Sequence, residues 1–341
     1  TSRVLKNSKV QLDDINITKE ELESFDRVFI VACGTAYHAG LVGKTIIERL
    51  AKIPVEVDIA SEFRYRDPLI TEKSLLIVVS QSGETADTLA VLRDAKRIGA
   101  KVLAITNVVG SSASREAHHV LYTWAGPEIA VASTKAYETQ LIAMYILGIY
   151  FGEVKGTISN EIADSLKDEL MNLPEKVNEI LDKKDDLQKF ASKNYMDKDL
   201  FFLGRGLDYA VALEGSLKLK EISYIHSEAY AGGELKHGPI ALIENGTPVI
   251  ALLTEERLKD KMISNIREVV TRGARVLAIA NEGDEDAKEV CNDVIYIPRT
   301  NSLLTPVLSV VPLQLISYYM AKQKGCDVDK PRNLAKSVTV E

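Results

Sequence analysis

An internal repeat is the feature of this sequence that most narrows the folds open to it. The segment RVFIVACG at 27–34 recurs as DLFFLGRG at 199–206, an offset of 172 residues. Farther along, KVLAITN ends at Asn107 and RVLAIAN ends at Asn281, an offset of 174 residues. Chance similarity between buried strands would not reproduce both the order and the spacing, so we expect two copies of one domain.

Each copy alternates short apolar runs with amphipathic stretches. In the first copy we expect strands at 27–32, 54–60, 75–79, 101–106 and 119–124, and helices at 38–51, 86–98 and 133–150. The segment 54–60 alternates more than the others, which favours a place near the sheet edge. This order predicts an α/β fold of two tandem domains, each a parallel sheet flanked by helices on both faces.

The rest of the chain connects or extends these two domains. We expect a helical lead-in over 1–26, a first domain over 27–155, a charged helical bridge over 156–196, a second domain over 197–323 and an irregular C-terminal tail over 324–341. In the lead-in, Thr18 and Glu21 have the spacing of a capping box. In the bridge, Pro174 is expected to break the helix.

A turn rich in hydroxyl groups, SQSGET at 80–85, separates a buried strand from a helix in the first copy. Amide N–H groups and the positive end of the helix dipole converge at such a turn, which favours an anion. Ser80, Ser82 and Thr85 add hydroxyls and Gln81 adds an amide. Because the turn lacks the lysine of an ATP-binding P-loop, a phosphate monoester on a small molecule fits best. The alternative is that these side chains only cap the helix.

The second copy differs at this turn. The corresponding segment, LTEERL at 253–258, offers carboxylates in place of hydroxyls. Carboxylates repel phosphate, so we expect only the first copy to bind it.

Three charged residues of the second copy share one face of a predicted helix. Glu214, Lys218 and Glu221 are spaced by four and three residues. One interpretation is a solvated ladder of ion pairs. The other places them at the carboxyl end of a strand, where a lysine and a carboxylate can stabilise an enediolate and move a proton between adjacent carbons.

Two further groups have candidate chemical roles. His237 lies in EAYAGGELKHGP at 228–239, which we interpret as an irregular loop, and an imidazole there can open a sugar ring. Lys336 lies near the end of the tail, where packing against the body would lower the pKa of its amine from about 10.4 toward neutrality and leave it nucleophilic. The remaining histidines are expected to make structural hydrogen bonds: His38, His118, His119 and His226.

Composition excludes several classes of function. The net charge is −7 and the basic residues are scattered, which argues against nucleic-acid binding. No apolar run reaches the roughly 20 residues of a membrane span, and the first residues lack the apolar core of a signal peptide. Cys33, Cys291 and Cys326 have no metal-ligand spacing and make an odd number, so we expect a reducing cytoplasm, no disulfide framework, no metal and no cofactor.

These segments together resemble the sugar isomerase (SIS) family, and within it the isomerase half of the glucosamine-6-phosphate synthases. The resemblance covers nearly the whole chain and rests on CGTAYHAG, SEFRYR, SQSGETADTL, VASTKAY, LEGSLKLKEISYIH, ELKHGP and PRNLAKSVTVE. SQSGET is shared across the wider family, whereas ELKHGP and the tail are far more selective.

The resemblance implies a binding site for fructose 6-phosphate. It assigns the phosphate to Ser80, Gln81, Ser82 and Thr85, and the sugar to Cys33, Gly34, Thr35, Val131, Ser133 and Ala335. The family commonly has a serine where Ala36 stands, so one hydrogen bond to the phosphate is missing here, a contact worth about 1.5–3 kcal/mol.

The resemblance also implies the chemistry. Glu221 would move the proton between C1 and C2 while Lys218 stabilises the enediolate. His237, from the partner subunit of a homodimer, would open the ring, and Lys336 would attack the C2 carbonyl as an imine. Ammonia added at that carbon would give glucosamine 6-phosphate.

The source of that ammonia lies outside these residues. The family's glutaminase domain uses an N-terminal cysteine, and Thr1 cannot replace it. We therefore expect interconversion of fructose 6-phosphate and glucose 6-phosphate, with amination only where free ammonia, a partner or a glutaminase domain in a longer chain supplies nitrogen. The alternatives are a stand-alone SIS isomerase or deglycase, and a non-catalytic sugar-phosphate sensor.

Overall fold

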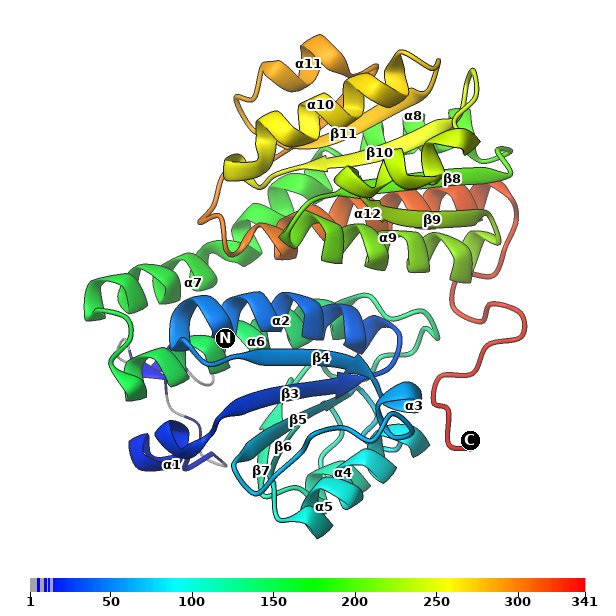
Figure 1. The fold of residues 1–341 in the computed structure, drawn as a ribbon. Coiled ribbons are helices and arrows are strands. Elements are labelled where there is room, and N and C mark those ends of the chain that lie inside the picture. The colour runs from blue at the N-terminus through cyan, green and yellow to red at the C-terminus, as the bar shows by residue number, and fades with distance from the viewer. Residues whose placement is uncertain (1–4, 7–8, 11, 13–14, 341) are drawn as a thin grey trace. The chain divides into compact units, whose positions relative to one another are not determined.

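The computed structural model describes residues 5–6, 9–10, 12 and 15–340, and the chain forms two compact units. The first unit comprises the chain up to Ile129, Ser133–Met171 and the tail from Ala335 (Figure 1). The second unit comprises Ala130–Ala132 and Asn172–Leu334. Thr1 and Glu341, where the expected lead-in begins and the expected tail ends, lie outside the described residues.

The first unit alternates strands and helices as the sequence predicts. Its elements are β1 (Leu5–Lys6), β2 (Lys9–Val10), α1 (Lys19–Ser24), β3 (Arg27–Ala32), α2 (Thr35–Ala51), β4 (Val55–Ile59), α3 (Ala60–Phe63), β5 (Ser74–Ser80), α4 (Ala86–Ile98), β6 (Lys101–Thr106), α5 (Ser112–Glu116), β7 (His119–Tyr122) and α6 (Lys135–Lys155). The boundary with the second unit falls inside α7 (Asn160–Asp182).

The first sheet is parallel and has the strand order β4-β3-β5-β6-β7. One face packs on α2 and α6 through residues such as Ile77 and Met144, and the other packs on α3, α4 and α5 through residues such as Val78 and Leu92. Every residue of the central strand β5 is buried, which explains its continuous apolar run. Helices on both faces confirm the predicted fold class.

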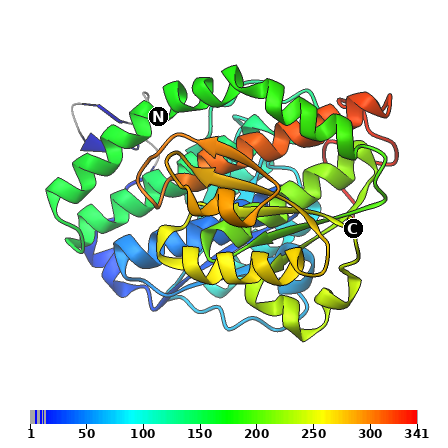
Figure 2. The same ribbon diagram turned by 90° about the horizontal axis from the view of Figure 1, so that it is seen from above.

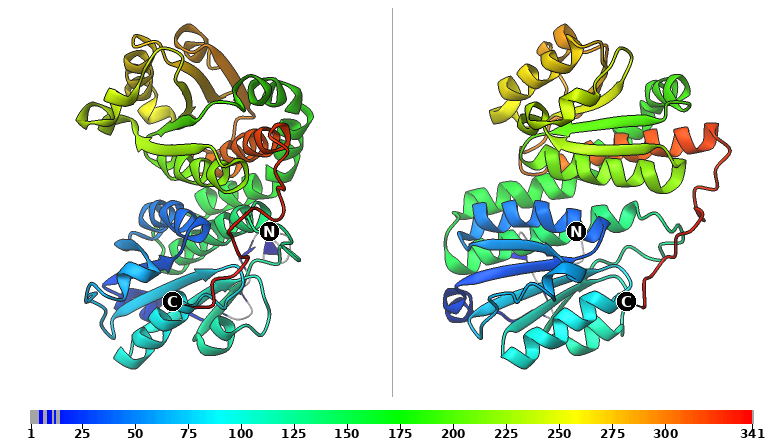
Figure 3. Two further views of the ribbon diagram at one scale, coloured as in Figure 1. Left: turned by 90° about the vertical axis from the view of Figure 1, so that its right-hand side faces the viewer. Right: turned by 45° about the vertical axis from the view of Figure 1, so that its right-hand side comes forward.

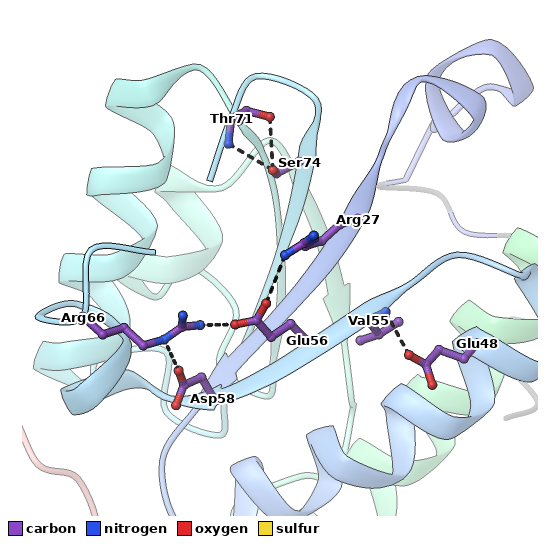
Figure 4. Close-up of polar contacts among 8 residues, drawn as sticks. All are labelled: Arg27, Glu48, Val55, Glu56, Asp58, Arg66, Thr71 and Ser74. Atoms are coloured by element: carbon purple, nitrogen blue, oxygen red, sulfur yellow. Dashed lines mark hydrogen bonds and ion pairs between the residues drawn. The ribbon is translucent and has the colours of Figure 1, made fainter. Parts of the chain in front are cut away.

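The edge strand β4 is held by charged side chains instead of a further strand (Figure 4). The Glu56 carboxylate accepts from the guanidinium of Arg27 at 3.3 Å and also pairs with Arg66. Nε of Arg66 lies 2.5 Å from Oδ2 of Asp58. Arg66 belongs to the SEFRYR motif, so these ion pairs tie the segment after α3 to the sheet edge and leave a charged edge that resists pairing with another chain.

The second unit repeats this topology. Its elements are α8 (Lys184–Asn194), β8 (Asp199–Gly204), α9 (Leu207–Ser223), β9 (His226–Ala231), the 3₁₀ helices η1 (Gly232–His237) and η2 (Pro239–Leu242), β10 (Pro248–Leu253), η3 (Glu256–Leu258), α10 (Lys259–Val270), β11 (Arg275–Asn281), α11 (Asp286–Val290), β12 (Asp293–Ile297) and α12 (Thr305–Gln323). The parallel order β9-β8-β10-β11-β12 equals that of the first sheet, with β8 in the place of β3 and β10 in the place of β5.

Helices cover both faces of the second sheet as well. The helices α10 and α11 pack on one face of this sheet through residues such as Ile266 and Ala287. Figure 2 shows the second unit from the side of these two helices. The helices α9 and α12 run along the other face in Figure 1. Their contact is close, because a Cβ added at Gly215 of α9 would meet Leu313 of α12 and Phe202 of β8.

Local expectations were mostly confirmed, with three corrections. Thr18 caps α1 by accepting from the Glu21 amide at 3.2 Å. Pro174 does not break its helix, because α7 continues to Asp182 and forgoes only the hydrogen bond that proline cannot donate. The helix expected from His38 begins three residues earlier, at Thr35. The expected loop at 228–239 is partly wrong, because β9 pairs with β8 up to Ala231.

The turn from β8 into α9 generates a prediction about Gly204. A Cβ at this position would overlap the backbone of Asp208 and Tyr209, which cannot rotate away. We expect Gly204→Ala to lower the free energy of unfolding by about 3 kcal/mol or more, measured by urea denaturation. Gly246→Ala is the control: its φ is +88° and its Cβ would meet nothing within 4 Å, so only backbone strain of about 1–2 kcal/mol is expected. A Gly204→Ala loss no larger than that of the control would contradict this packing.

Candidate active site

The turn between β5 and α4 in the first unit is held by its own hydroxyl groups. Oγ of Ser80 accepts from the Gly83 amide at 3.1 Å and lies 3.0 Å from Oγ1 of Thr85. Gly83 adopts φ +68°, and a Cβ there would overlap the side chain of Ser111. Thr85 is the N-cap residue of α4, yet its side chain makes no capping hydrogen bond. The capping interpretation is therefore wrong for Thr85, and the amides at the start of α4 need other acceptors.

The C-terminal tail supplies some of these acceptors. The Ala86 amide, the first of α4, donates to the carbonyl oxygen of Val338 at 3.1 Å. Oγ of Ser82 accepts from the Glu84 amide at 3.2 Å and lies 3.0 Å from Oγ of Ser337. In Figure 3 the red end of the tail lies beside this end of α4. The tail is therefore bound to the turn in the first unit.

The same stretch of tail brings Lys336 to the start of α6. Nζ of Lys336 donates to Oγ of Ser133 at 3.3 Å. Ala335, the first tail residue of the first unit, precedes it directly. Val131 belongs to the second unit, where its amide donates to the Asp329 carbonyl at 3.0 Å. Thus Ser133, Ala335 and Lys336 share the first unit with the hydroxyl-rich turn.

The end of β3 adds a second strand-to-helix turn to the first unit. Gly34 has φ +54°, and a Cβ at this position would meet nothing within 4 Å, so the space above it is open. Burial raises the pKa of the Cys33 thiol, the Ala60 amide partly offsets this, and Asp87 of α4 adds to the rise. Thr35 begins α2, and Ala36 packs in the apolar cluster beneath it. Cys33 therefore lies close to α4, the helix that follows the hydroxyl-rich turn.

The charged face of α9 is buried, so the solvated-ladder interpretation is wrong. The side chains of Glu214 and Lys218 are 0% and 2% exposed. Nζ of Lys218 lies 3.4 Å from Oε1 of Glu214 and pairs closely with Oε2 of Glu221. Burial alone would lower the pKa of Lys218, but the two carboxylates more than offset it and raise the pKa. Lys218 is therefore a cation at neutral pH, able to donate to a developing oxyanion.

The histidines have different surroundings. His237 ends η1 and is exposed. Nδ1 of His118 accepts from the Val102 amide at 3.0 Å, and Nδ1 of His226 lies 2.9 Å from Asp199, as expected for structural histidines. Nε2 of His119 is buried with no hydrogen-bond partner among the described residues, which contradicts the expectation for that residue.

Comparison with known proteins identifies the family. The model of the SIS domain matches residues 21–150 and again 195–322. The chain belongs to the SIS domain family. The two matches fall on the two sheets, and the names first and second SIS domain are used for them below.

Similar proteins within the family are enzymes whose chains are longer than this one. The chain is 66% identical over its whole length to the glutamine–fructose-6-phosphate aminotransferase (isomerizing) of Clostridium acetobutylicum, and 69% identical to that of Clostridium perfringens. In each case it covers 56% of the relative, so it spans about half the length of the curated relatives it matches.

Solved structures agree with these relatives. The C-terminal domain of the glucosamine-fructose-6-phosphate aminotransferase of Francisella tularensis superimposes with a TM-score of 0.91 at 41% identity, over 97% of this chain and 93% of that one. A glucosamine-6-phosphate deaminase of Thermotoga maritima superimposes with a TM-score of 0.73 at 25% identity, over 94% of this chain and 95% of that one. This chain is therefore a homologue of the C-terminal domain of the aminotransferase.

The described part of the chain offers neither a membrane span nor a cluster of metal ligands. No helix there is both long and apolar enough to cross a membrane. No group of three His, Cys, Asp or Glu side chains there could hold a metal ion.

One titratable residue of the first SIS domain, Glu138, belongs to none of the sequence motifs. Glu138 lies near the start of α6, where burial and the charge of Glu128 raise the pKa of its carboxyl group to about 7. Oε2 of Glu128 accepts from the Ala136 amide at 3.0 Å and so caps the same helix. The only signal in the sequence is a single carboxylate inside the apolar run at 133–150.

The raised pKa of Glu138 predicts a pH dependence of stability. The folded state holds a proton on this carboxyl that the unfolded chain releases near pH 4.5, so stability is lost as pH rises from about 4.5 through about 7. We expect Glu138→Gln to remove this loss, of up to about 3 kcal/mol between pH 5 and pH 8, as measured by urea denaturation. Glu23→Gln, on the exposed surface of α1, is the control and should leave the pH profile unchanged. Identical profiles for Glu138→Gln and the wild type would contradict the raised pKa.

Proposed function

We propose that this chain is the isomerase part of a glutamine–fructose-6-phosphate aminotransferase. It binds fructose 6-phosphate, opens the ring, isomerises ketose to aldose through an enediolate, and aminates C2 to glucosamine 6-phosphate when a glutaminase domain supplies ammonia. The observation that carries this proposal is that the tail is hydrogen-bonded beside the SQSGET turn. Ser337 bonds to Ser82, and the Val338 carbonyl accepts from the Ala86 amide. These contacts keep the amine of Lys336 in the same unit as the turn, where it bonds to Ser133.

The phosphate binds at the turn between β5 and α4. Ser80, Gln81, Ser82 and Thr85 bond its oxygens, together with the amides of the turn. The hydroxyls already bond to one another and to the tail, so the phosphate exchanges these contacts for its own. Because Ala36 has no hydroxyl group, the affinity for phosphate comes mainly from the side chains and backbone amides of the turn between β5 and α4.

The sugar lies between the two turns of the first SIS domain and the residues after β7. The residues proposed to line it are Cys33, Gly34, Thr35, Val131, Ser133 and Ala335. The open space above Gly34 supports this arrangement, because an approaching ligand meets no side chain there. The amine of Lys336, beside Ser133, adds to the C2 carbonyl and forms an imine, and the C2 oxygen leaves as water.

The proton transfer is assigned to α9. Glu221 takes a proton from C1 and delivers it to C2, while Lys218 donates a hydrogen bond to the enediolate oxygen. The raised pKa of Lys218 supports this role, because the side chain stays protonated through the reaction. In the aminating reaction ammonia displaces the Lys336 amine from the C2 imine before this proton transfer, and the transfer from C1 to C2 then gives glucosamine 6-phosphate.

Ring opening is assigned to a second copy of the chain. We place His237 of a homodimer partner at the sugar ring oxygen, which agrees with the exposure of this residue at the end of η1. We keep the domain limits proposed from the sequence, 27–155 and 197–323. We also propose that the protein acts in the cytoplasm.

The phosphate assignment predicts a loss of affinity. We expect Ser82→Ala combined with Thr85→Ala to weaken fructose 6-phosphate binding by about 3–6 kcal/mol in titration calorimetry, because each hydroxyl bonds an ionised oxygen. Ser24→Ala, an exposed hydroxyl on α1, is the matched control and should bind as the wild type does. Unchanged affinity in the double variant would remove the phosphate from this turn.

The assignment of Lys336 predicts a loss of turnover without a loss of fold. We expect Lys336→Ala to abolish interconversion of fructose 6-phosphate and glucose 6-phosphate in a coupled assay, with an unchanged thermal midpoint. Lys330→Ala removes an exposed amine six residues earlier and should retain turnover. Turnover by Lys336→Ala at the wild-type rate would reduce the tail to a structural role.

A further inference from the structure

The second SIS domain contains a counterpart of the two turns that form the proposed site in the first. The turn from β8 into α9 corresponds to the turn from β3 into α2, and the turn after β10 corresponds to SQSGET after β5. Gly206 has φ +59°, close to the φ of +54° at Gly34. The backbones therefore agree, and the difference lies in what occupies the space between the two turns.

A carboxylate of the chain itself occupies this space. Glu255 is 4% exposed, and its Oε2 accepts from the amide of Leu207, the first residue of α9, at 2.9 Å. A Cβ added at Gly206 would overlap this carboxylate, whereas one added at Gly34 would meet nothing within 4 Å. Glu255 thus holds the position that is open in the first SIS domain.

A second carboxylate completes a reciprocal arrangement. Asp208, on the first turn of α9, accepts from the Thr254 amide at 2.8 Å, from the Thr254 hydroxyl at 2.5 Å and from the Glu255 amide at 3.2 Å. Burial raises the pKa of Asp208 to about 6, and the charge of Glu255 adds to the rise. Nε of Arg257, 2.5 Å from Oε1 of Glu255, offsets part of that charge. The start of α9 and the end of β10 are therefore joined by several short polar contacts.

The helix whose first amide donates to Glu255 is α9, which carries the proposed proton-transfer residues. Lys218 follows Leu207 by eleven residues, or about 17 Å along a helix, and Glu221 lies one turn farther. A helix transmits a displacement of its first turn along its axis, and a shift of about 1 Å is enough to cost a large factor in rate.

We propose that Glu255 is a positioning residue: its carboxylate serves as a built-in anion that fixes the start of α9 and so the placement of Lys218 and Glu221. It also occupies the space that is open above Gly34 in the first SIS domain, so that the second SIS domain has no room there for a sugar phosphate. The catalytic part of this inference depends on the proposed isomerase function, whereas the anchoring of α9 does not.

The test compares variants of the full chain by activity. We expect Glu255→Ala to lower kcat for fructose 6-phosphate isomerisation by 10- to 100-fold and to change KM less than threefold, because the phosphate binds in the first SIS domain. Formate, which fits the space left by the carboxylate, should restore kcat at least fivefold. Glu255→Gln keeps an acceptor for the Leu207 amide without the charge and should lose less than tenfold. Glu256→Ala, the exposed neighbour, is the matched control and should stay within twofold of the wild type.

A second readout is independent of activity. Amide hydrogen exchange over residues 207–211 should quicken at least tenfold in Glu255→Ala and slow again with formate. Unchanged exchange, or a kcat equal to that of the wild type, would overturn the positioning role. If Glu255→Ala does not fold, Glu255→Gln decides: a reduced kcat at constant KM supports the role, and wild-type values overturn it. If the wild-type chain does not isomerise fructose 6-phosphate, the proposed function is wrong. The hydrogen-exchange rates of residues 207–211 would still test whether Glu255 fixes the start of α9.

Discussion

The first amides of a helix that follows a parallel strand need acceptors, and the way this need is met distinguishes the two halves of this chain. In the first SIS domain the side chain of Thr85 does not cap α4, and the Ala86 amide donates to the tail carbonyl of Val338. In the second, Glu255 permanently accepts from the Leu207 amide. The first amides of α4 and α9 thus find their acceptors far away in the chain, in the tail for α4 and in a buried carboxylate for α9.

The two copies of the domain differ in the features that suit them to a role in function. The first SIS domain keeps open space above Gly34 and a hydroxyl-rich turn, which suit a ligand. In the second, Glu255 accepts from the first amide of α9, the helix in which Lys218 and Glu214 are buried and Glu221 is partly exposed. Burying Lys218 and Glu214 would be costly without pairing, and the two carboxylates around Lys218 keep its amine protonated.

Local patterns in the sequence predicted the elements of the fold, because a strand, a turn and a helix are each specified by neighbours in the chain. SQSGET begins at the last residue of β5 and leads into α4, as predicted, and the spacing of Glu214, Lys218 and Glu221 correctly put them on one face. Their burial could not be predicted, since exposed and buried ion pairs share one spacing. The contact of Glu255 with Leu207 spans 48 residues and depends on β8 lying beside β10. Likewise, the raised pKa of Glu138 arises from tertiary packing.

The central claim is that the turn between β5 and α4 binds one sugar phosphate per chain, and that in the second SIS domain the Glu255 carboxylate occupies the space that is open above Gly34 in the first. The most direct measurement is titration calorimetry with fructose 6-phosphate, together with a crystal structure that locates the phosphorus atom. This account predicts one molecule bound per chain, with phosphorus beside Ser80, Ser82 and Thr85. Two molecules per chain, or phosphorus beside the Leu207 amide in place of the Glu255 carboxylate, would contradict it.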